Sequence, residues 1–142
     1  MKTPARLLLP LLLILAPAVR AAEKGGFKYP PVFEGARTEV YKTVGDVKLN
    51  LSIFEPATGP KTGRPAIVFF FGGGWTNGSP AQFEQQCRHL ASRGMVAITA
   101  DYRVASRHQV KPVACVADAK SALRWVRANA RSEEHTSELQ SH

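Results

Sequence analysis

Several features that mark common protein classes are scarce or missing in this sequence. Two cysteines among 142 residues exclude a disulfide-dense scaffold. No apolar run approaches the roughly 20 residues that cross a bilayer, so no stable membrane span is expected. Neither an internal repeat nor a cluster of His, Cys and Asp with metal-ligand spacing occurs. We therefore expect one modest globular domain that requires neither a metal nor a cofactor.

Charge clustering is also missing. The chain carries 19 Lys+Arg against 11 Asp+Glu, but its basic residues are scattered in pairs such as Arg103 with Arg107 and Arg124 with Arg127. Nucleic-acid binding domains concentrate such residues on one face. The pattern favours a solvated surface, and no nucleic-acid partner is expected.

The two ends of the chain differ in composition from its middle. Lys2 and Arg6 precede the apolar run Leu7–Leu15, and small residues follow as far as Ala21. This pattern predicts a signal peptide over residues 1–21, with an uncleaved anchor as the alternative, and hence a secreted or periplasmic protein. At the other end, residues 131–142 are polar and resemble a translated sequencing adapter, so we exclude them from the fold.

The domain is predicted to begin with an antiparallel hairpin. Residues 22–37 form an extended leader rich in Gly and Pro, and the strands 38–44 and 47–54 follow. The connection Gly45-Asp46 suits a type II′ turn. The second strand alternates cleanly, which places four apolar residues on one face: Val47, Leu49, Leu51 and Ile53.

Two further strands and two helices complete the predicted domain, residues 38–130. The unbroken apolar run 66–71 predicts a strand buried in the centre of a parallel sheet, and residues 95–100 predict a second buried strand. Between them, Ser79 is expected to cap a helix and Gln82 to complete its capping box. This helix buries Phe83, Cys87, Leu90 and Ala91, and the helix 113–130 buries Val116, Ala119, Leu123, Val126 and Ala130. The alternation of strands and helices indicates an α/β fold.

A glycine-rich loop is the most informative segment for function. Gly72, Gly73 and Gly74 follow the end of an apolar strand and precede Trp75 and a helix. Glycines allow a backbone whose successive N–H groups point into one space, where they stabilise negative charge. Either a phosphate or the oxyanion of an acyl-transfer transition state would fit such a loop.

From the hairpin to Ala130, the chain resembles the N-terminal part of an α/β-hydrolase. The resemblance is to the esterase/lipase group related to hormone-sensitive lipase and to the bacterial feruloyl and acetyl-xylan esterases. It is carried by Phe71-Gly-Gly-Gly-Trp75, Asp101-Tyr-Arg103 and the segment 115–127. It implies the three-layer α/β-hydrolase fold, truncated here, and a serine carboxylic ester hydrolase acting on small-molecule or carbohydrate esters. The N–H groups of Gly73 and Gly74 would then belong to the oxyanion hole, and Trp75 could line the substrate pocket.

The sequence departs from that group at two points. Phe71 occupies the position where the group has histidine, so a side chain that could hydrogen-bond within the loop is replaced by an apolar ring. We expect proline at Gly73 or Gly74 to damage a complete enzyme far more than Phe71→His. No Gly-x-Ser-x-Gly pentapeptide is present, so the Ser-Asp-His triad is expected outside this chain and the chain alone is expected to be inactive.

Other interpretations stay open at this point. A dinucleotide-binding domain would use the glycine loop for phosphate and Asp101 for ribose, and a non-catalytic secreted binding module of the same fold is a third possibility. Arg103 is expected to form a structural ion pair with Asp118. Cys87 and Cys115 lie on different predicted helices, and the sequence favours neither a disulfide nor two free thiols.

Overall fold

The computed structural model describes residues 28–139, with side chains described for residues 28–130. The predicted signal peptide and residues 140–142 lie outside the described residues. The elements in chain order are β1 (Arg37–Val44), β2 (Val47–Phe54), β3 (Ala66–Phe70), the 3-10 helix η1 (Pro80–Phe83), α1 (Glu84–Ser92), β4 (Val96–Ala100), α2 (Ala105–His108) and α3 (Pro112–Leu139).

The opening hairpin forms as the sequence predicts. β1 and β2 pair antiparallel with Val44 opposite Val47, and Gly45 adopts φ 57°, which a type II′ turn needs at its first central residue. The second half of β2 is covered on both faces, because Ser52 and Phe54 are buried as well, whereas clean alternation predicts one exposed face. The predicted apolar face is confirmed at Leu49 and Leu51, which are fully buried. Burying each of these side chains is worth about 1.5–3 kcal/mol relative to an exposed one.

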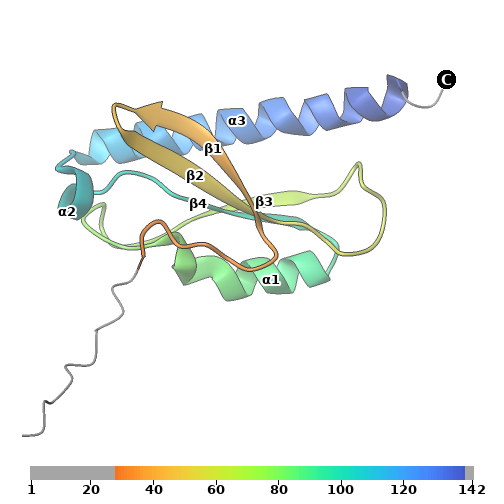
Figure 1. The fold of residues 1–142 in the computed structure, drawn as a ribbon, viewed down its shortest axis with the longest axis horizontal. Coiled ribbons are helices and arrows are strands. Elements are labelled where there is room, and N and C mark those ends of the chain that lie inside the picture. Colours follow the sequence, from red (N-terminus) through yellow and green to blue (C-terminus); the bar gives the residue numbers. More distant parts are fainter. Residues whose placement is uncertain (1–27, 140–142) are drawn as a thin grey trace, which may run out of the picture.

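The four strands form one mixed sheet in the order β1-β2-β4-β3. β2 and β4 are antiparallel, whereas β3 and β4 are parallel with Val68 opposite Ile98. The parallel pair joined through α1 confirms the predicted strand-helix-strand unit. α1 covers one face of the sheet and α3 the other (Figure 1).

The described core has three apolar clusters: one on each face of the sheet, and a third that joins the segments after β3 and β4 to α3 through Phe71, Tyr102, Val104 and Cys115. On the α1 side, Cys87 and Ala91 pack with Phe33, Phe54 and Ala97, so the end of the predicted leader contributes a core residue. On the α3 side, the buried residues are Leu51, Ile53, Ile98, Ala100 and Ala122.

Three predictions about these elements are wrong. β3 lies at the edge of the described sheet instead of its centre, and its residues after Ala66 are only half-buried because β4 pairs with one side alone. The segment before Pro112 contains the short helix α2, which was predicted as loop. α3 continues to Leu139 instead of ending at Ala130.

The predicted buried face of α3 is also wrong. Val116 and Leu123 are 43% and 38% exposed, whereas Cys115, Asp118 and Ala122 are buried. A charged residue therefore occupies a core position of the helix. Apolar periodicity cannot find such a face, because it assigns aspartate to the solvent side. No helix in the described range 28–139 combines the length and apolarity needed to cross a membrane.

Candidate functional site

The glycine loop leaves the sheet at the carboxyl end of β3, on the same side of the fold as α2 (Figure 1). Three successive residues have left-handed backbone: Gly73 has φ 135°, Gly74 φ 61° and Trp75 φ 60°. Glycine is required most strictly at Gly73, where a Cβ atom would lie 2.2 Å from the carbonyl oxygen of Asn77. At Gly74 a Cβ atom would meet open space.

Backbone hydrogen bonds fix the central peptide of the loop. The Gly73 carbonyl oxygen accepts from the N–H groups of Thr76 at 3.1 Å and Asn77 at 3.3 Å. Because the C=O and N–H of a trans peptide point in opposite directions, this fixes the Gly74 N–H away from Thr76 and Asn77. The N–H groups of Gly73 and Gly74 donate to no acceptor among the described residues. The loop therefore presents two adjacent, unpaired donors.

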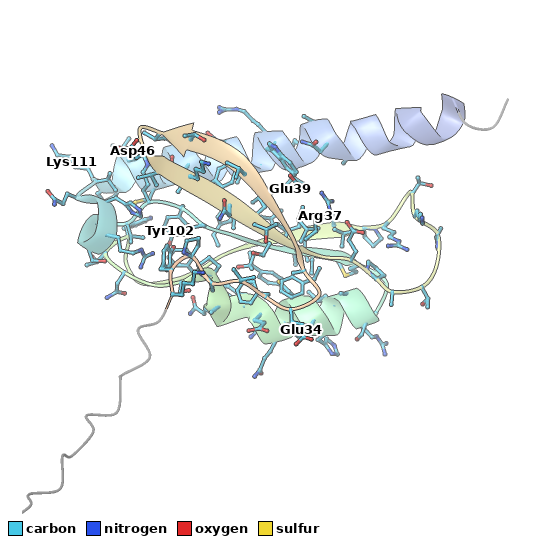
Figure 2. The ribbon with its side chains drawn as sticks, viewed as in Figure 1. Glu34, Arg37, Glu39, Asp46, Tyr102 and Lys111 are labelled. Atoms are coloured by element: carbon cyan, nitrogen blue, oxygen red, sulfur yellow. The ribbon has the colours of Figure 1, made fainter. Side chains whose placement is uncertain are left out.

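Phe71 anchors the start of the loop. Its ring is buried and stacks on Tyr102, with 4.1 Å between ring centroids. The Tyr102 hydroxyl donates to the Phe71 carbonyl oxygen at 2.5 Å. Figure 2 shows Tyr102 at the end of the sheet beside α2. The Phe71 ring cannot hydrogen-bond, but it is held in place by stacking on Tyr102.

Gln82 holds the same peptide from its other side. Its Oε1 accepts from the Gly72 N–H at 2.6 Å. The predicted capping box is wrong in this respect, because the Gln82 side chain bonds the loop and not the cap residue. Ser79 does cap η1, since its hydroxyl oxygen accepts from the Ala81 N–H at 3.3 Å.

The first turn of α2 supports the far side of the loop. The N–H groups of Ala105 and Ser106 donate to the carbonyl oxygens of Trp75 and Thr76, each at 2.9 Å. The loop is therefore held from three directions: by Tyr102 after β4, by Gln82 in η1 and by α2. These supports could not be predicted from the sequence, because each depends on contacts between separate segments.

Trp75 lies beside a mainly apolar hollow. Its side chain is 51% exposed and contributes to a space of about 260 Å³. The hollow is also lined by Phe70, Tyr102, Val116 and Leu123. The hollow reaches the glycine loop at Phe71 and Trp75, the residues that flank the three glycines, and its mainly apolar wall suits the apolar part of a ligand.

The segment Asp101-Tyr-Arg103 has structural contacts. Asp101 is buried, accepts hydrogen bonds from the Tyr29 hydroxyl and the Tyr102 N–H, and has its pKa raised by burial. The expected ion pair is confirmed, with Arg103 Nε 2.8 Å from Asp118 Oδ2.

Lys42 adds a second cation to Asp118, with its Nζ 2.7 Å from Oδ1, and this contact was not anticipated. Burial alone would raise the pKa of Asp118. The hydrogen bonds from Arg103 and Lys42 outweigh burial and lower the pKa below its usual value.

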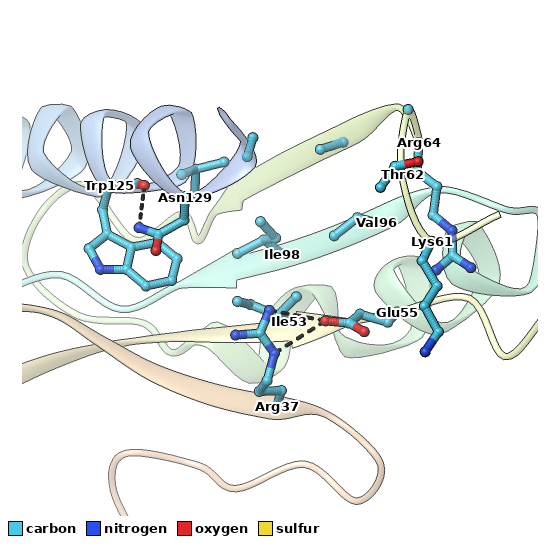
Figure 3. A pocket seen from close by; sticks show the side chains of 14 residues that line it. Arg37, Ile53, Glu55, Lys61, Thr62, Arg64, Val96, Ile98, Trp125 and Asn129 are labelled. Atoms are coloured by element: carbon cyan, nitrogen blue, oxygen red, sulfur yellow. Dashed lines mark hydrogen bonds and ion pairs between the residues drawn. The ribbon is translucent and has the colours of Figure 1, made fainter. Parts of the chain in front are cut away.

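A second hollow, of about 130 Å³, lies at the opposite end of the sheet (Figure 3). Both of its arginines are engaged: Arg37 pairs with Glu55 at 3.0 Å, and Arg64 donates to backbone carbonyl oxygens of its own loop. Trp125 and Asn129 form another part of its wall. Because its arginines already have partners within the fold, we place the candidate site at the glycine loop.

The cysteines are both free and buried, one on each face of the sheet. The sequence favoured neither a disulfide nor two free thiols, and the structure has two free thiols.

The described part has the α/β-hydrolase fold, because it matches solved esterases of that class at high identity. A thermophilic esterase from the planctomycete Thermogutta terrifontis, solved with propionate bound, is 62% identical over 72% of this chain, with a TM-score of 0.69. The same esterase phosphorylated by paraoxon matches at 62% identity over 72% of this chain, with a TM-score of 0.68. This chain covers 38% and 40% of those two structures.

The BD-FAE family model matches residues 51–138, and the chain belongs to that family. Esterase LipC of Mycobacterium tuberculosis is 38% identical over 71 residues, which is 49% of this chain and 17% of LipC. Probable carboxylesterase 8 of Arabidopsis thaliana is 31% identical over 96 residues, which is 61% of this chain and 29% of that protein. The chain thus spans less than a third of the length of these relatives.

Proposed function

We propose that this chain is the oxyanion-loop part of a carboxylic ester hydrolase. The observation that carries the proposal is the pair of unpaired N–H donors at Gly73 and Gly74, in a loop held from three sides. Donors that are fixed before the reaction stabilise developing negative charge without reorganising. Membership of the BD-FAE family and the likeness to named esterases support the same reaction class.

The proposed reaction is acyl transfer through a serine. The serine oxygen attacks the ester carbonyl carbon while a histidine accepts its proton, and the carbonyl π electrons move onto the carbonyl oxygen. Gly73 and Gly74 donate to that oxygen, together with one N–H beside the nucleophile. Collapse of the intermediate expels the alcohol, which takes the proton from the histidine and leaves the acyl group on the serine. Water, deprotonated by the histidine, then attacks this acyl group and releases the acid, and the serine regains its proton. The serine, histidine and acidic residue are proposed to lie outside this sequence, which has no Gly-x-Ser-x-Gly pentapeptide.

Small-molecule or carbohydrate esters are the proposed substrates. The apolar hollow beside Trp75 supports an apolar acyl or alcohol group next to the oxyanion donors. The Thermogutta esterase was solved with propionate and, in another structure, with butyrate. We therefore infer that short acyl chains are accepted. Secretion or periplasmic export is proposed from residues 1–21, and no described residue bears on it.

The structure argues against a dinucleotide-binding domain, because the acidic residue that would bind the ribose is not available. Asp101 would have to hold a ribose hydroxyl, but the residue is 3% exposed, and its carboxylate accepts hydrogen bonds from the Tyr29 hydroxyl and the Tyr102 N–H. A binding module that lacks the triad would differ from the proposed esterase in activity alone, and the residues beyond this sequence distinguish the two. The following experiment tests whether residues 28–130 can supply the oxyanion donors.

The test is a chimera in which residues 28–130 replace the matching segment of the Thermogutta esterase. We expect the chimera to melt cooperatively, to hydrolyse p-nitrophenyl propionate and to be covalently labelled by paraoxon. A chimera whose residues 28–130 cannot support an oxyanion hole would fold but neither turn over the ester nor take up the label. That result would overturn the proposed function. The unmodified Thermogutta esterase is the matched control.

A further inference from the structure

The peptide between Phe71 and Gly72 is hydrogen-bonded at both its carbonyl oxygen and its N–H group. Its carbonyl oxygen accepts from the Tyr102 hydroxyl at 2.5 Å, and its N–H donates to Gln82 Oε1 at 2.6 Å. These atoms lie on opposite sides of a planar trans peptide, so the two side chains prevent it from rotating. It is the last peptide before those that carry the Gly73 and Gly74 N–H groups.

We propose that Gln82 is a positioning residue for the oxyanion donors, an inference that rests on the proposed esterase function. Gln82 touches the loop, so it acts on the reaction only through the direction of the Gly73 and Gly74 N–H groups. The glycines on either side of the Gly72 carbonyl resist rotation poorly. The Phe71 side chain offers no polar group, which leaves the anchoring of this peptide to Gln82 and Tyr102.

The Gln82 side chain makes few other contacts in the described structure. It is an exposed residue of η1, and within residues 28–130 its side chain forms one hydrogen bond, with the Gly72 N–H. Gln85 provides a matched comparison. It is an exposed glutamine three residues later, on α1, and its side chain has no hydrogen bond in the same described range.

The test compares Gln82→Met with Gln85→Met in the chimera defined above. Methionine keeps the length and helix propensity of glutamine but accepts no strong hydrogen bond. We expect Gln82→Met to lower kcat about five- to tenfold, the usual effect of one net hydrogen bond, with KM within about twofold. The melting temperature should match that of Gln85→Met. Gln82→Ala deletes the same acceptor and repeats the test if the methionine variant does not fold.

A second measurement follows the Gly72 N–H directly by NMR of protein labelled with ¹⁵N-glycine. Its amide proton should move upfield in Gln82→Met, because the hydrogen bond is lost. It should stay near its original position in Gln82→Glu, which retains an acceptor. The Gly45 amide, in the hairpin turn, is the internal control and should not move.

Three results would overturn the inference: a kcat for Gln82→Met equal to that of Gln85→Met, a rise in KM at constant kcat, or a loss of kcat that follows the melting temperature. The second would make Gln82 a substrate contact, and the third would make it a structural residue. A folded but inactive parent chimera would instead refute the proposed function. In that case an unmoved Gly72 amide in Gln82→Met would refute the positioning role separately.

Discussion

Asp118 and Arg103 form a two-point ion pair that joins α3 to the segment after β4. Arg103 Nε lies 2.8 Å from Oδ2, and its Nη2 lies 3.0 Å from Oδ1. Asp118 is fully buried, and Lys42 from β1 reaches the same carboxylate. Asp118 therefore connects α3 to strand β1, through Lys42, and to the segment after β4, through Arg103.

Removal of the Asp118 charge should destabilise the protein strongly. Asp118→Asn leaves two half-buried cations without a counter-charge, and breaking a buried pair in this way costs about 3 kcal/mol. Urea unfolding of the chimera measures this loss. Asp46→Asn, at the exposed tip of the hairpin (Figure 2), is the control and should change stability by less than about 0.5 kcal/mol. Equal effects of the two substitutions would contradict the structural role of the pair.

The same carboxylate predicts a loss of stability in acid. The pKa of Asp118 is lowered in the folded state, so its contribution is complete above the unfolded value of about 3.9 and is lost as pH falls through the folded pKa. Unfolding free energies measured from pH 7 downward should therefore fall below about pH 4.

Asp101 should act in the opposite direction, because burial raises its pKa and protonation then favours the folded state. In Asp118→Asn the acid loss should be shallower, and in Asp101→Asn it should be steeper. Identical pH profiles for the two variants would contradict the assigned directions.

The two loop glycines should differ in their tolerance of alanine. Gly73→Ala places Cβ against the Asn77 carbonyl oxygen, so the loop must shift, and kcat of the chimera should fall by about 10²-fold if one oxyanion donor is lost. Gly74→Ala meets open space and carries only the backbone strain of about 1–2 kcal/mol at φ 61°. Gly45→Ala also places alanine at a positive φ with open space around its Cβ atom, in a distant turn, and is the control for a loss of stability without a loop contact. A larger kcat loss for Gly74→Ala than for Gly73→Ala would contradict the loop geometry.

Both cysteines should be unreactive thiols in the folded protein. Burial raises the pKa of Cys87 to about 11 and also raises the pKa of Cys115, and the thiolate is the nucleophilic form. Iodoacetamide should label neither residue in native buffer and both in denaturant. Intact mass should not change on reduction. A mass increase of two hydrogens on reduction would show the disulfide that the structure lacks.

Elements governed by local rules could be predicted from the sequence. The hairpin followed from the alternation in β2 and from Gly45, and the start of η1 followed from Ser79, since turn and cap chemistry involve neighbouring residues. The buried face of α3 could not be predicted in this way. Asp118 is stable in the core only because Lys42 and Arg103, from two distant segments, supply its counter-charges.

The candidate site also has a part that the local sequence determines and a part that tertiary contacts determine. The sequence by itself determined the glycine loop, because only glycine accommodates the backbone at Gly73 and leaves its N–H groups accessible. Tertiary structure decided how that loop is held. Gln82 could bond either the cap of its own helix or the Gly72 N–H, and the folding of the loop back over η1 selected Gly72. Local chemistry fixes which conformations a segment can adopt, whereas its partners depend on segments that only the complete fold brings together.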